Sequence, residues 1–432
     1  MKTKSLSRRS FLAKSAGVAV APMIVPASIF GKNGTVAPSN RITIGAIGIG
    51  GRMTRAVLPG HLAHSDVQVV AVADCFADRQ QTGKEMVDTH YGNHDCKTYR
   101  FHEEILQRDD IDAVLIATGD RWHSPLSAEA ARYGKDVYCE KPFCLTIKEG
   151  RRLVNLMNRL GTVWQCGTQR RSVDTYAFVV DVVHRGLIGH LEEMVAYLGG
   201  PWRKDFIPMP APEPVPEPDV FDYDRWLGQS PLAPYSDTRV RHWRNRWDTS
   251  GGLISDMGPH YSDIMQWAHE SEMDAPVEFD VEACQWPDPK GFSEVPITFD
   301  VHARYADGVR VRFTNGDKGI LFKGDQGWIH ISDLGVITAD PVSILAERRN
   351  FASRNYQDMG GHTRNFLDAV KNRTLTASHP ELAQRGHTLA HCANICMRLG
   401  RKVEWDSHRE QFVDDPEANR LLDRTMRSPW IV

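Results

Sequence analysis

Three ionisable side chains stand at helical spacing in one apolar stretch of this 432-residue chain. Asp256, His260 and Asp263 are four and then three residues apart, so they share one face of a helix predicted over residues 253–269. A histidine can move a proton near neutral pH, and a carboxylate one turn away can orient it or hold a hydroxyl. A satisfied buried network and a metal pair are the alternatives, but no further ligand cluster of fixed spacing accompanies these residues. We therefore predict acid–base chemistry and no metal site.

A second candidate is the segment Cys139-Glu140-Lys141-Pro142-Phe143, which follows a short predicted strand. Ligands of open α/β sheets bind beyond the carboxyl ends of the strands, so Glu140 and Lys141 are placed where substrate and cofactor can meet. The alternative is a surface salt bridge in a turn, and spacing alone leaves both interpretations open.

A glycine-rich turn, Gly48-Ile49-Gly50-Gly51-Arg52-Met53, follows the first predicted strand. Glycines there let the backbone bend tightly and approach a pyrophosphate, which lies at the N-terminus of the next helix. Asp74 ends the second predicted strand, where a carboxylate can accept both ribose hydroxyls of NAD and repel the 2′-phosphate of NADP. Together they predict a nicotinamide dinucleotide site with NAD favoured over NADP, although Met53 stands where the fingerprint has its third glycine.

The elements that must position these groups alternate between strand and helix. Short apolar runs at 41–48, 67–74, 112–118, 136–139 and 162–166 are separated by helical stretches that include 125–133 and 147–160. This alternation predicts a parallel sheet covered by helices on both faces, that is, a Rossmann domain over residues 38–166.

The pattern changes after residue 166, and we predict a second domain over residues 167–432. Its expected elements are helices at 173–185, 253–269, 362–371 and 381–399, a strand at 191–198 and a proline-rich loop at 209–218. Turn sequences at Asp307-Gly308, Asn315-Gly316 and Gly324-Asp325-Gln326-Gly327 predict hairpins. The predicted fold class is therefore α/β, with an N-terminal Rossmann parallel sheet followed by an α+β domain that carries a large, mostly antiparallel open sheet.

Composition and the N-terminus limit the classes of function. The formal net charge of −3 argues against a general nucleic-acid binder, and no apolar run is long enough for a membrane span. Residues 7–14, Ser-Arg-Arg-Ser-Phe-Leu-Ala-Lys, precede a mildly apolar stretch and look like a twin-arginine export signal. We expect residues 1–37 to be signal and linker, and the protein to be periplasmic or attached to the cell envelope.

These three motifs, in this order and at these distances, resemble the Gfo/Idh/MocA family, which is named for glucose–fructose oxidoreductase and inositol dehydrogenase. The resemblance covers about residues 41–432, and its most specific parts are the Glu140-Lys141-Pro142 tripeptide and the helix that carries Asp256 and His260. It implies that Lys141 lies by the nicotinamide and the substrate hydroxyl, that His260 is the acid/base group and that Asp256 holds the sugar.

The resemblance also implies that Thr118 and His123 border the cofactor, although Gly119 stands where the family usually has proline. Removing hydride from a carbinol carbon requires a base for the hydroxyl proton and a cation for the developing alkoxide, roles that His260 and Lys141 can fill. We therefore predict an NAD(P)-dependent oxidoreductase that acts on a secondary hydroxyl of a sugar, polyol or glycoside. A glycoside-cleaving enzyme with a transient redox cycle, and a non-catalytic dinucleotide- or sugar-binding protein, stay open.

Two further expectations concern partners. Free NAD is scarce outside the cytoplasm, so an exported enzyme should keep its dinucleotide tightly bound. A homo-oligomer is expected through the open face of the C-terminal sheet, around residues 298–314. A carbohydrate-facing wall or a subunit interface is equally compatible with a set of aromatic and basic residues: Trp202, Arg203, Arg241, His242, Trp243, Arg244 and Trp247.

Overall fold

A computed structural model describes residues 36–37, 40–202, 206–347, 360–430 and 432. The chain divides into two compact units, residues 1–41 and 42–432, and the second unit carries the strands and helices of the fold. The twin-arginine segment and Arg203 lie outside the described residues, so their assignments stay predictions. Within the described residues, no helix combines the length and the apolar character needed to cross a bilayer.

The N-terminal half of the second unit is built on a six-stranded sheet in the order β3-β2-β1-β4-β5-β6. All its strand pairs are parallel, as the buried Val- and Ile-rich runs predict. The strand order reverses between β1 and β4, which creates the switch point at which such sheets bind ligands. The strands are β1 (Ile42–Ile47), β2 (Val67–Ala73), β3 (Lys97–Tyr99), β4 (Ala113–Ile116), β5 (Asp136–Cys139) and β6 (Trp164–Cys166).

Helices cover this sheet, and α6 shows typical capping residues at both ends. The helix α6 begins after Thr146, whose hydroxyl accepts a hydrogen bond from the Glu149 N–H at 3.2 Å, and it ends at the left-handed Gly161. The helices of this half are α2 (Leu58–Leu62), α3 (Ala77–Tyr91), α4 (His102–Leu106), α5 (His123–Arg132) and α6 (Ile147–Leu160).

The C-terminal half is built on a nine-stranded sheet in the order β13-β12-β11-β7-β10-β9-β8-β14-β15. Its strand pairs are antiparallel except for β7 with β10, so the predicted fold class is confirmed. The strands are β7 (Leu191–Gly199), β8 (Glu278–Gln285), β9 (Thr298–Arg304), β10 (Arg310–Thr314), β11 (Gly316–Gly324), β12 (Trp328–Ser332), β13 (Ile337–Asp340), β14 (Val403–Asp406) and β15 (Gln411–Phe412).

One predicted hairpin is wrong. Strands β10 and β11 are consecutive in sequence, but β7 lies between them and pairs with both. The Asn315 side chain joins neighbouring strands instead of closing a two-residue turn, because its Oδ1 accepts from the Phe299 N–H at 2.8 Å and its Nδ2 donates to the Gly199 carbonyl at 3.2 Å. The turns at Asp307-Gly308 and Gly324–Gly327 do connect antiparallel neighbours, β9 with β10 and β11 with β12.

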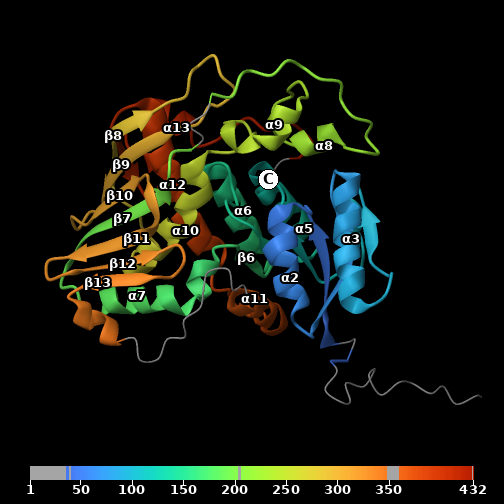
Figure 1. Ribbon diagram of the computed structural model, residues 1–432, viewed down its shortest axis with the longest axis horizontal. Coiled ribbons are helices and arrows are strands. Elements are labelled where there is room, and N and C mark those ends of the chain that lie inside the picture. Colours follow the sequence, from blue (N-terminus) through green and yellow to red (C-terminus); the bar gives the residue numbers. More distant parts are fainter. Residues whose placement is uncertain (1–35, 38–39, 203–205, 348–359, 431) are drawn as a thin grey trace, which may run out of the picture. The chain divides into compact units, whose positions relative to one another are not determined.

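The helices α7 (Asp174–His184), α10 (Leu253–Ala268) and α12 (Pro380–Leu399) pack their apolar side chains against the second sheet and complete its core. Figure 1 shows α10 and α12 between this sheet and the Rossmann half, and α12 packs against α6 as well as β8. The helices of this half are α7 (Asp174–His184), α8 (Tyr223–Leu227), α9 (Asp237–Arg241), α10 (Leu253–Ala268), α11 (Gly360–Asn372), α12 (Pro380–Leu399) and α13 (Pro416–Arg420).

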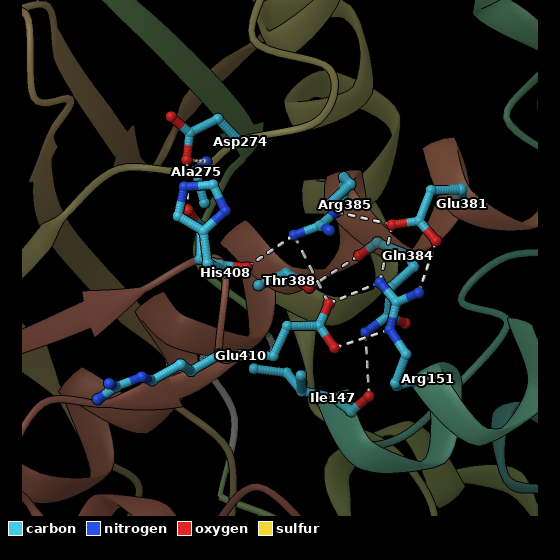
Figure 2. Close-up of polar contacts among 12 residues, drawn as sticks. Ile147, Arg151, Asp274, Ala275, Glu381, Gln384, Arg385, Thr388, His408 and Glu410 are labelled. Carbon is cyan, nitrogen blue, oxygen red and sulfur yellow. Dashed lines mark hydrogen bonds and ion pairs between the residues drawn. The ribbon is translucent and has the colours of Figure 1, made fainter. Parts of the chain in front are cut away.

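An ionic cluster fastens α12 to α6 (Figure 2). The Arg151 guanidinium on α6 donates to Glu410 at 2.7 and 2.8 Å and also to Glu381 at the start of α12. Arg385, one turn along α12, donates to Glu381 at 2.8 Å. Because two carboxylates share two guanidiniums, the cluster holds the α10–α12 layer in place on the Rossmann half.

Candidate active site

The glycine turn lies at the switch point, pressed against the end of β4. Gly48 has a φ of +84°, and a Cβ there would stand 2.5 Å from Thr118 Cγ2 and 2.8 Å from the Thr118 backbone nitrogen. Gly50 is different, since a Cβ there would meet no atom within 4 Å. Gly48 therefore shapes the turn, whereas Gly50 leaves open space above it.

Asp74 braces this turn from the end of β2. Its Oδ2 accepts from the Ile49 N–H at 2.6 Å and its Oδ1 from the Phe76 N–H at 2.9 Å. Burial raises the pKa of Asp74, while Arg79 and the two backbone donors work against that rise. Asp74 lines the cavity over the turn, so the carboxylate predicted to hold the ribose also fixes the glycine loop.

A cavity of about 230 Å³ extends from the glycine turn past Asp74. Its floor is Rossmann backbone and side chains, including Gly50, Gly51 and Thr118. Its opposite wall comes from the segment that holds α8 and α9, which contributes Arg225, Trp226, Val240, Trp243 and Arg244. We call this second wall the roof, and its helices can be followed in Figure 1.

The roof is anchored to the Rossmann half by buried contacts. The Arg121 guanidinium is 1% exposed, donates through Nε to the Trp226 carbonyl at 2.8 Å and lies 4.0 Å from the centre of the Trp226 ring. The Trp122 indole N–H donates to the Arg225 carbonyl at 2.9 Å. Phe76, just after Asp74, stacks on Phe221 with ring centres 3.9 Å apart. Arg121 and Trp226 were not predicted, because no local sequence pattern indicates a contact between residues that are 105 positions apart.

A second cavity of about 280 Å³ adjoins the first and shares Gly51, Arg52, Thr118 and Arg244 with it. The two predicted catalytic motifs meet in it. Lys141 Nζ donates to Asp256 Oδ1 at 2.9 Å and to the Asp256 carbonyl at 2.8 Å. The structure thus brings a lysine from the end of β5 onto a carboxylate in the first turn of α10.

The Asp256 carboxylate lies next to two cationic side chains, Lys141 and Arg244. Burial would raise the pKa of Asp256, but Lys141 and then Arg244 outweigh it and hold the pKa at about 2. The Arg244 guanidinium stands 3.7 Å from Asp256 Oδ1 and 4.2 Å from the centre of the Trp243 ring. Asp256 is therefore ionised at neutral pH and faces two cations on the wall of the cavity.

His260 lies one turn further along α10 and is 4% exposed. Its Nδ1 is buried with no hydrogen-bond partner. Burial lowers its pKa well below 6.5, and the cations Arg170, Lys141 and Arg52 lower it further. The imidazole is therefore neutral and can accept a proton, but it does not belong to the lining of either cavity as far as the chain is described.

Two other predicted residues, Glu140 and His123, line the second cavity and also make contacts that support it. Glu140 is 3% exposed and accepts from Arg52 Nε at 2.8 Å. His123 is 1% exposed, its Nδ1 stands 2.6 Å from the Pro142 carbonyl, and burial lowers its pKa to about 4. Both side chains brace the turn that carries Lys141, and both also line the second cavity.

Besides His260, three predicted positions lie away from the two cavities. Ile49 and Met53 are buried in the Rossmann core, which explains how Met53 replaces a glycine without blocking the turn. Asp263, the third member of the helix stripe, accepts from Arg171 Nε at 2.7 Å instead of joining Asp256. Of the candidate carbohydrate wall, Trp243 and Arg244 reach the two cavities, whereas Trp247 is enclosed elsewhere between two guanidiniums.

A dinucleotide-type glycine turn at the switch point of a parallel sheet, next to a lysine–carboxylate pair, is typical of NAD(P)-binding oxidoreductases. Residues 42–168 match the model of the oxidoreductase family NAD-binding Rossmann fold, and residues 175–432 match that of the family's C-terminal alpha/beta domain. The chain therefore belongs to the Gfo/Idh/MocA family of oxidoreductases.

Curated relatives in this family have diverse names. The chain is 27% identical over 227 residues to the rhizopine catabolism protein MocA of Rhizobium meliloti, which covers 52% of the chain and 57% of that protein. It is 27% identical over 271 residues to a glycosyl hydrolase family 109 protein of Saccharopolyspora erythraea, covering 53% and 58%. The chain thus spans about half the length of the curated relatives it matches.

Solved structures show the same fold at low identity. Aldose-aldose oxidoreductase from Caulobacter crescentus, crystallised with glycerol, has a TM-score of 0.64 at 16% identity over 84% of this chain and 99% of that one. The WlbA dehydrogenase from Chromobacterium violaceum, crystallised with NADH and UDP-GlcNAcA, has a TM-score of 0.63 at 15% identity over 89% and 99%.

Proposed function

We propose that this protein is a nicotinamide-dinucleotide-dependent oxidoreductase that acts on a secondary hydroxyl of a sugar, polyol or glycoside. The observation that carries the proposal is the contact between Lys141 and Asp256, which stands in the cavity adjoining the one at the glycine turn. A proton donor and an ionised acceptor are thereby held at one point, next to space suited to a dinucleotide.

The residues of the first cavity fit such a cofactor. Gly50 leaves its backbone open to a pyrophosphate, and Asp74 offers a carboxylate for ribose hydroxyls, which favours NAD over NADP. When bound, the nicotinamide supplies the hydride acceptor that no side chain can provide. The roof residue Trp226, held by Arg121, favours a cofactor that is retained between turnovers.

Protons and charge are handled by the chain itself. A substrate hydroxyl that enters the second cavity finds the Lys141 ammonium as a donor that stabilises a developing alkoxide. Asp256, ionised at neutral pH, can accept a hydrogen bond from a neighbouring hydroxyl of the same sugar. His260, kept neutral by burial, is the proposed base; because it lines neither cavity, the proton would reach it through Lys141, which does line the second cavity.

One variant pair tests this assignment. Lys141→Met should lower turnover at least about 100-fold, the scale of lost acid–base catalysis, while the affinity for the dinucleotide stays within about tenfold of the wild-type value. Lys148→Met, on the exposed side of α6, is the matched control and should keep wild-type activity. The assay adds sugars, inositols and glycosides one at a time and follows NADH. Wild-type turnover by Lys141→Met would refute the assignment.

A second candidate is a glycoside-cleaving enzyme that oxidises and re-reduces the sugar in one cycle. The roof over the first cavity favours it, because an enclosed cofactor is suited to a cycle without exchange. One matched relative is itself named a glycosyl hydrolase. Release of aglycone without accumulation of NADH would support this candidate, whereas stoichiometric NADH would support net oxidation.

Export and assembly remain part of the proposal. Residues 1–37 would carry the chain by the twin-arginine route, which transports folded proteins and so permits loading of the cofactor beforehand. The face of β9 and β10 that carries Asp300, Arg304 and Arg312 bears ion pairs and is the surface we propose for a homo-oligomer. Cell fractionation and light scattering at micromolar concentration test these two points.

A further inference from the structure

A third cavity, of about 310 Å³, lies apart from the proposed catalytic site. It shares no lining residue with the two cavities described above. Its volume is at the lower end of the range of small-molecule sites, about 300–1,000 Å³. Its walls come from the start of α6, the loop after α8, the segment before α10 and the C-terminal stretch near residue 425.

The cavity contains a polar side chain that the fold leaves unsatisfied. Gln229 is 4% exposed and lines the cavity, and neither its Oε1 nor its Nε2 has a hydrogen-bond partner. Its backbone is used, since the carbonyl accepts from the Arg427 N–H at 2.8 Å. A buried amide with both ends unpaired destabilises a fold unless something else bonds to it.

Two neighbours in the lining have unused atoms as well. Asp248 Oδ2 accepts from Arg239 Nη1 at 2.9 Å, whereas its Oδ1 accepts no hydrogen bond and has only the Arg246 guanidinium nearby, at 4.0 Å. Arg424 donates through Nη1 to the carbonyls of Trp247 and Ser250, while its Nε is unpaired. The lining therefore holds donors and acceptors without hydrogen bonds around one cavity.

The charges and walls define the kind of ligand. The charged groups of the lining already have partners: Asp248 pairs with Arg239 at 2.9 Å, Glu149 accepts from the Leu145 N–H at 2.6 Å, and Arg424 donates to two backbone carbonyls. A neutral ligand fits this lining without displacing any of them. The remaining wall is largely apolar, with Leu145, Pro231 and Met426 among its members. Hydroxyl groups both donate and accept, and a cyclic polyol carries them on an apolar ring.

We propose that this third cavity is a second ligand site, built around Gln229, that binds a neutral polyhydroxy compound of up to monosaccharide size. The site is independent of the catalytic assignment, because it rests on other residues. It also borders the active site through one segment of chain. Ser250, whose carbonyl accepts from Arg424, donates its hydroxyl to Asp120 Oδ2 at 2.6 Å, and Asp120 lines the second cavity.

The test compares ligand binding and stability in Gln229→Met, whose side chain has nearly the same length and no amide. The probes are D-glucose and myo-inositol, with gluconate as a charged comparator, titrated calorimetrically into the full-length protein as purified. We expect the variant to bind fewer equivalents of the neutral probes than the wild type, and to be at least as stable as the wild type without them. Met426→Leu, which keeps an apolar wall, should bind within about threefold of the wild type.

Some outcomes overturn the proposal. Unchanged stoichiometry in Gln229→Met would place all binding elsewhere. A less stable Gln229→Met, together with no effect of any neutral probe on the wild type, would mean that ordered water fills the cavity. Met426→Trp keeps the proposal testable if Gln229→Met fails to fold, because it fills the cavity without removing a polar group. A folded Met426→Trp that retains full binding would also overturn it. Catalytic activity is not a readout, so failure of this proposal leaves the proposed function untouched.

Discussion

The glycine turn allows a matched pair of substitutions whose effects should fall on different properties. Gly48 has a φ of +84°, a conformation that costs alanine about 1–2 kcal/mol. The added Cβ would stand 2.8 and 2.9 Å from the backbone nitrogen and Cα of Thr118, atoms that cannot rotate away. Overpacking of this kind costs a further ~1–3 kcal/mol. Gly48→Ala should therefore destabilise the cofactor-free protein by about 2–5 kcal/mol.

Gly50→Ala is the control for stability and the test for function. A Cβ at Gly50 meets nothing within 4 Å, so the free energy of unfolding should stay within about 1 kcal/mol of the wild-type value. The same methyl group projects from a residue that lines the cofactor cavity, where a pyrophosphate needs close access to the backbone. We expect dinucleotide affinity to fall at least tenfold, which is about 1.4 kcal/mol.

Urea unfolding, monitored with and without saturating NAD, measures both effects, since ligand binding to the folded state raises its apparent stability. Gly48→Ala should lower the midpoint in both series. Gly50→Ala should match the wild type without NAD and lose much of the increase that NAD produces. A Gly50→Ala protein that binds NAD normally would show that the turn is not a pyrophosphate site. Equal destabilisation by both substitutions would contradict the geometry of the turn.

Four other predictions concern the site and the core. His260→Asn should lower turnover at least about 100-fold at about pH 7.5, where burial keeps the wild-type imidazole neutral and able to accept a proton; near-wild-type turnover there would make His260 structural. Arg121→Gln frees the roof, so the dinucleotide should be lost on dialysis at least about tenfold faster, as measured by release of NAD(H) after denaturation. Glu410→Gln breaks the ionic cluster and should lower the free energy of unfolding in urea by about 2 kcal/mol, a value between those typical of exposed and of buried ion pairs. A double-mutant cycle of Arg151→Met and Glu410→Gln should show that the two side chains are energetically coupled. Acid should unfold the protein between about pH 6 and 4, because burial lowers the pKa of several core histidines from 6.5 to about 4 or 3. The stabilisation from each neutral histidine is complete above about pH 6.5 and falls with pH, and about 2 kcal/mol of it is lost per histidine by about pH 5. Retained stability at about pH 4.5 would contradict this. The histidines are His61, His123, His362, His387 and His391.

Local pattern predicted the fold well where the cause of structure is local. Continuous apolar runs located five of the six Rossmann strands, and period-3.6 spacing located the helices α6, α10 and α12, all within a few residues. The sixth strand, β3, was not predicted, because its three residues form no apolar run. The failure at Asn315-Gly316 has a non-local cause. The dipeptide suits a tight turn, but β7, more than 100 residues earlier, takes the place beside β10 that β11 would need. Strand order in a mixed sheet is decided by such distant pairings.

The candidate site also contains residues that local motifs predict and residues that they do not. The glycine turn, Lys141 and Asp256 carry recognisable chemistry in short motifs, and the structure brings the last two into contact. The roof has no such motif. Trp226 reaches the first cavity only because Arg121, on the loop after β4, is buried against it. The environment of His260 could not be read from the sequence either, since its pKa is depressed by burial first and then by cations from three separate segments.

Shared residues join the two cavities of the proposed catalytic site. Arg244 belongs to the roof, lines both cavities and stands near Asp256, so a substrate that displaces it would also disturb the cover over the dinucleotide. Retention of the cofactor and binding of the substrate are then coupled, and by thermodynamic reciprocity each must alter the affinity for the other. If the dinucleotide is retained as proposed, its reduced form has to be reoxidised in place. That requirement favours two half-reactions at one site, either on two substrates or within one glycoside-cleaving cycle, over a dehydrogenase that releases NADH at every turnover.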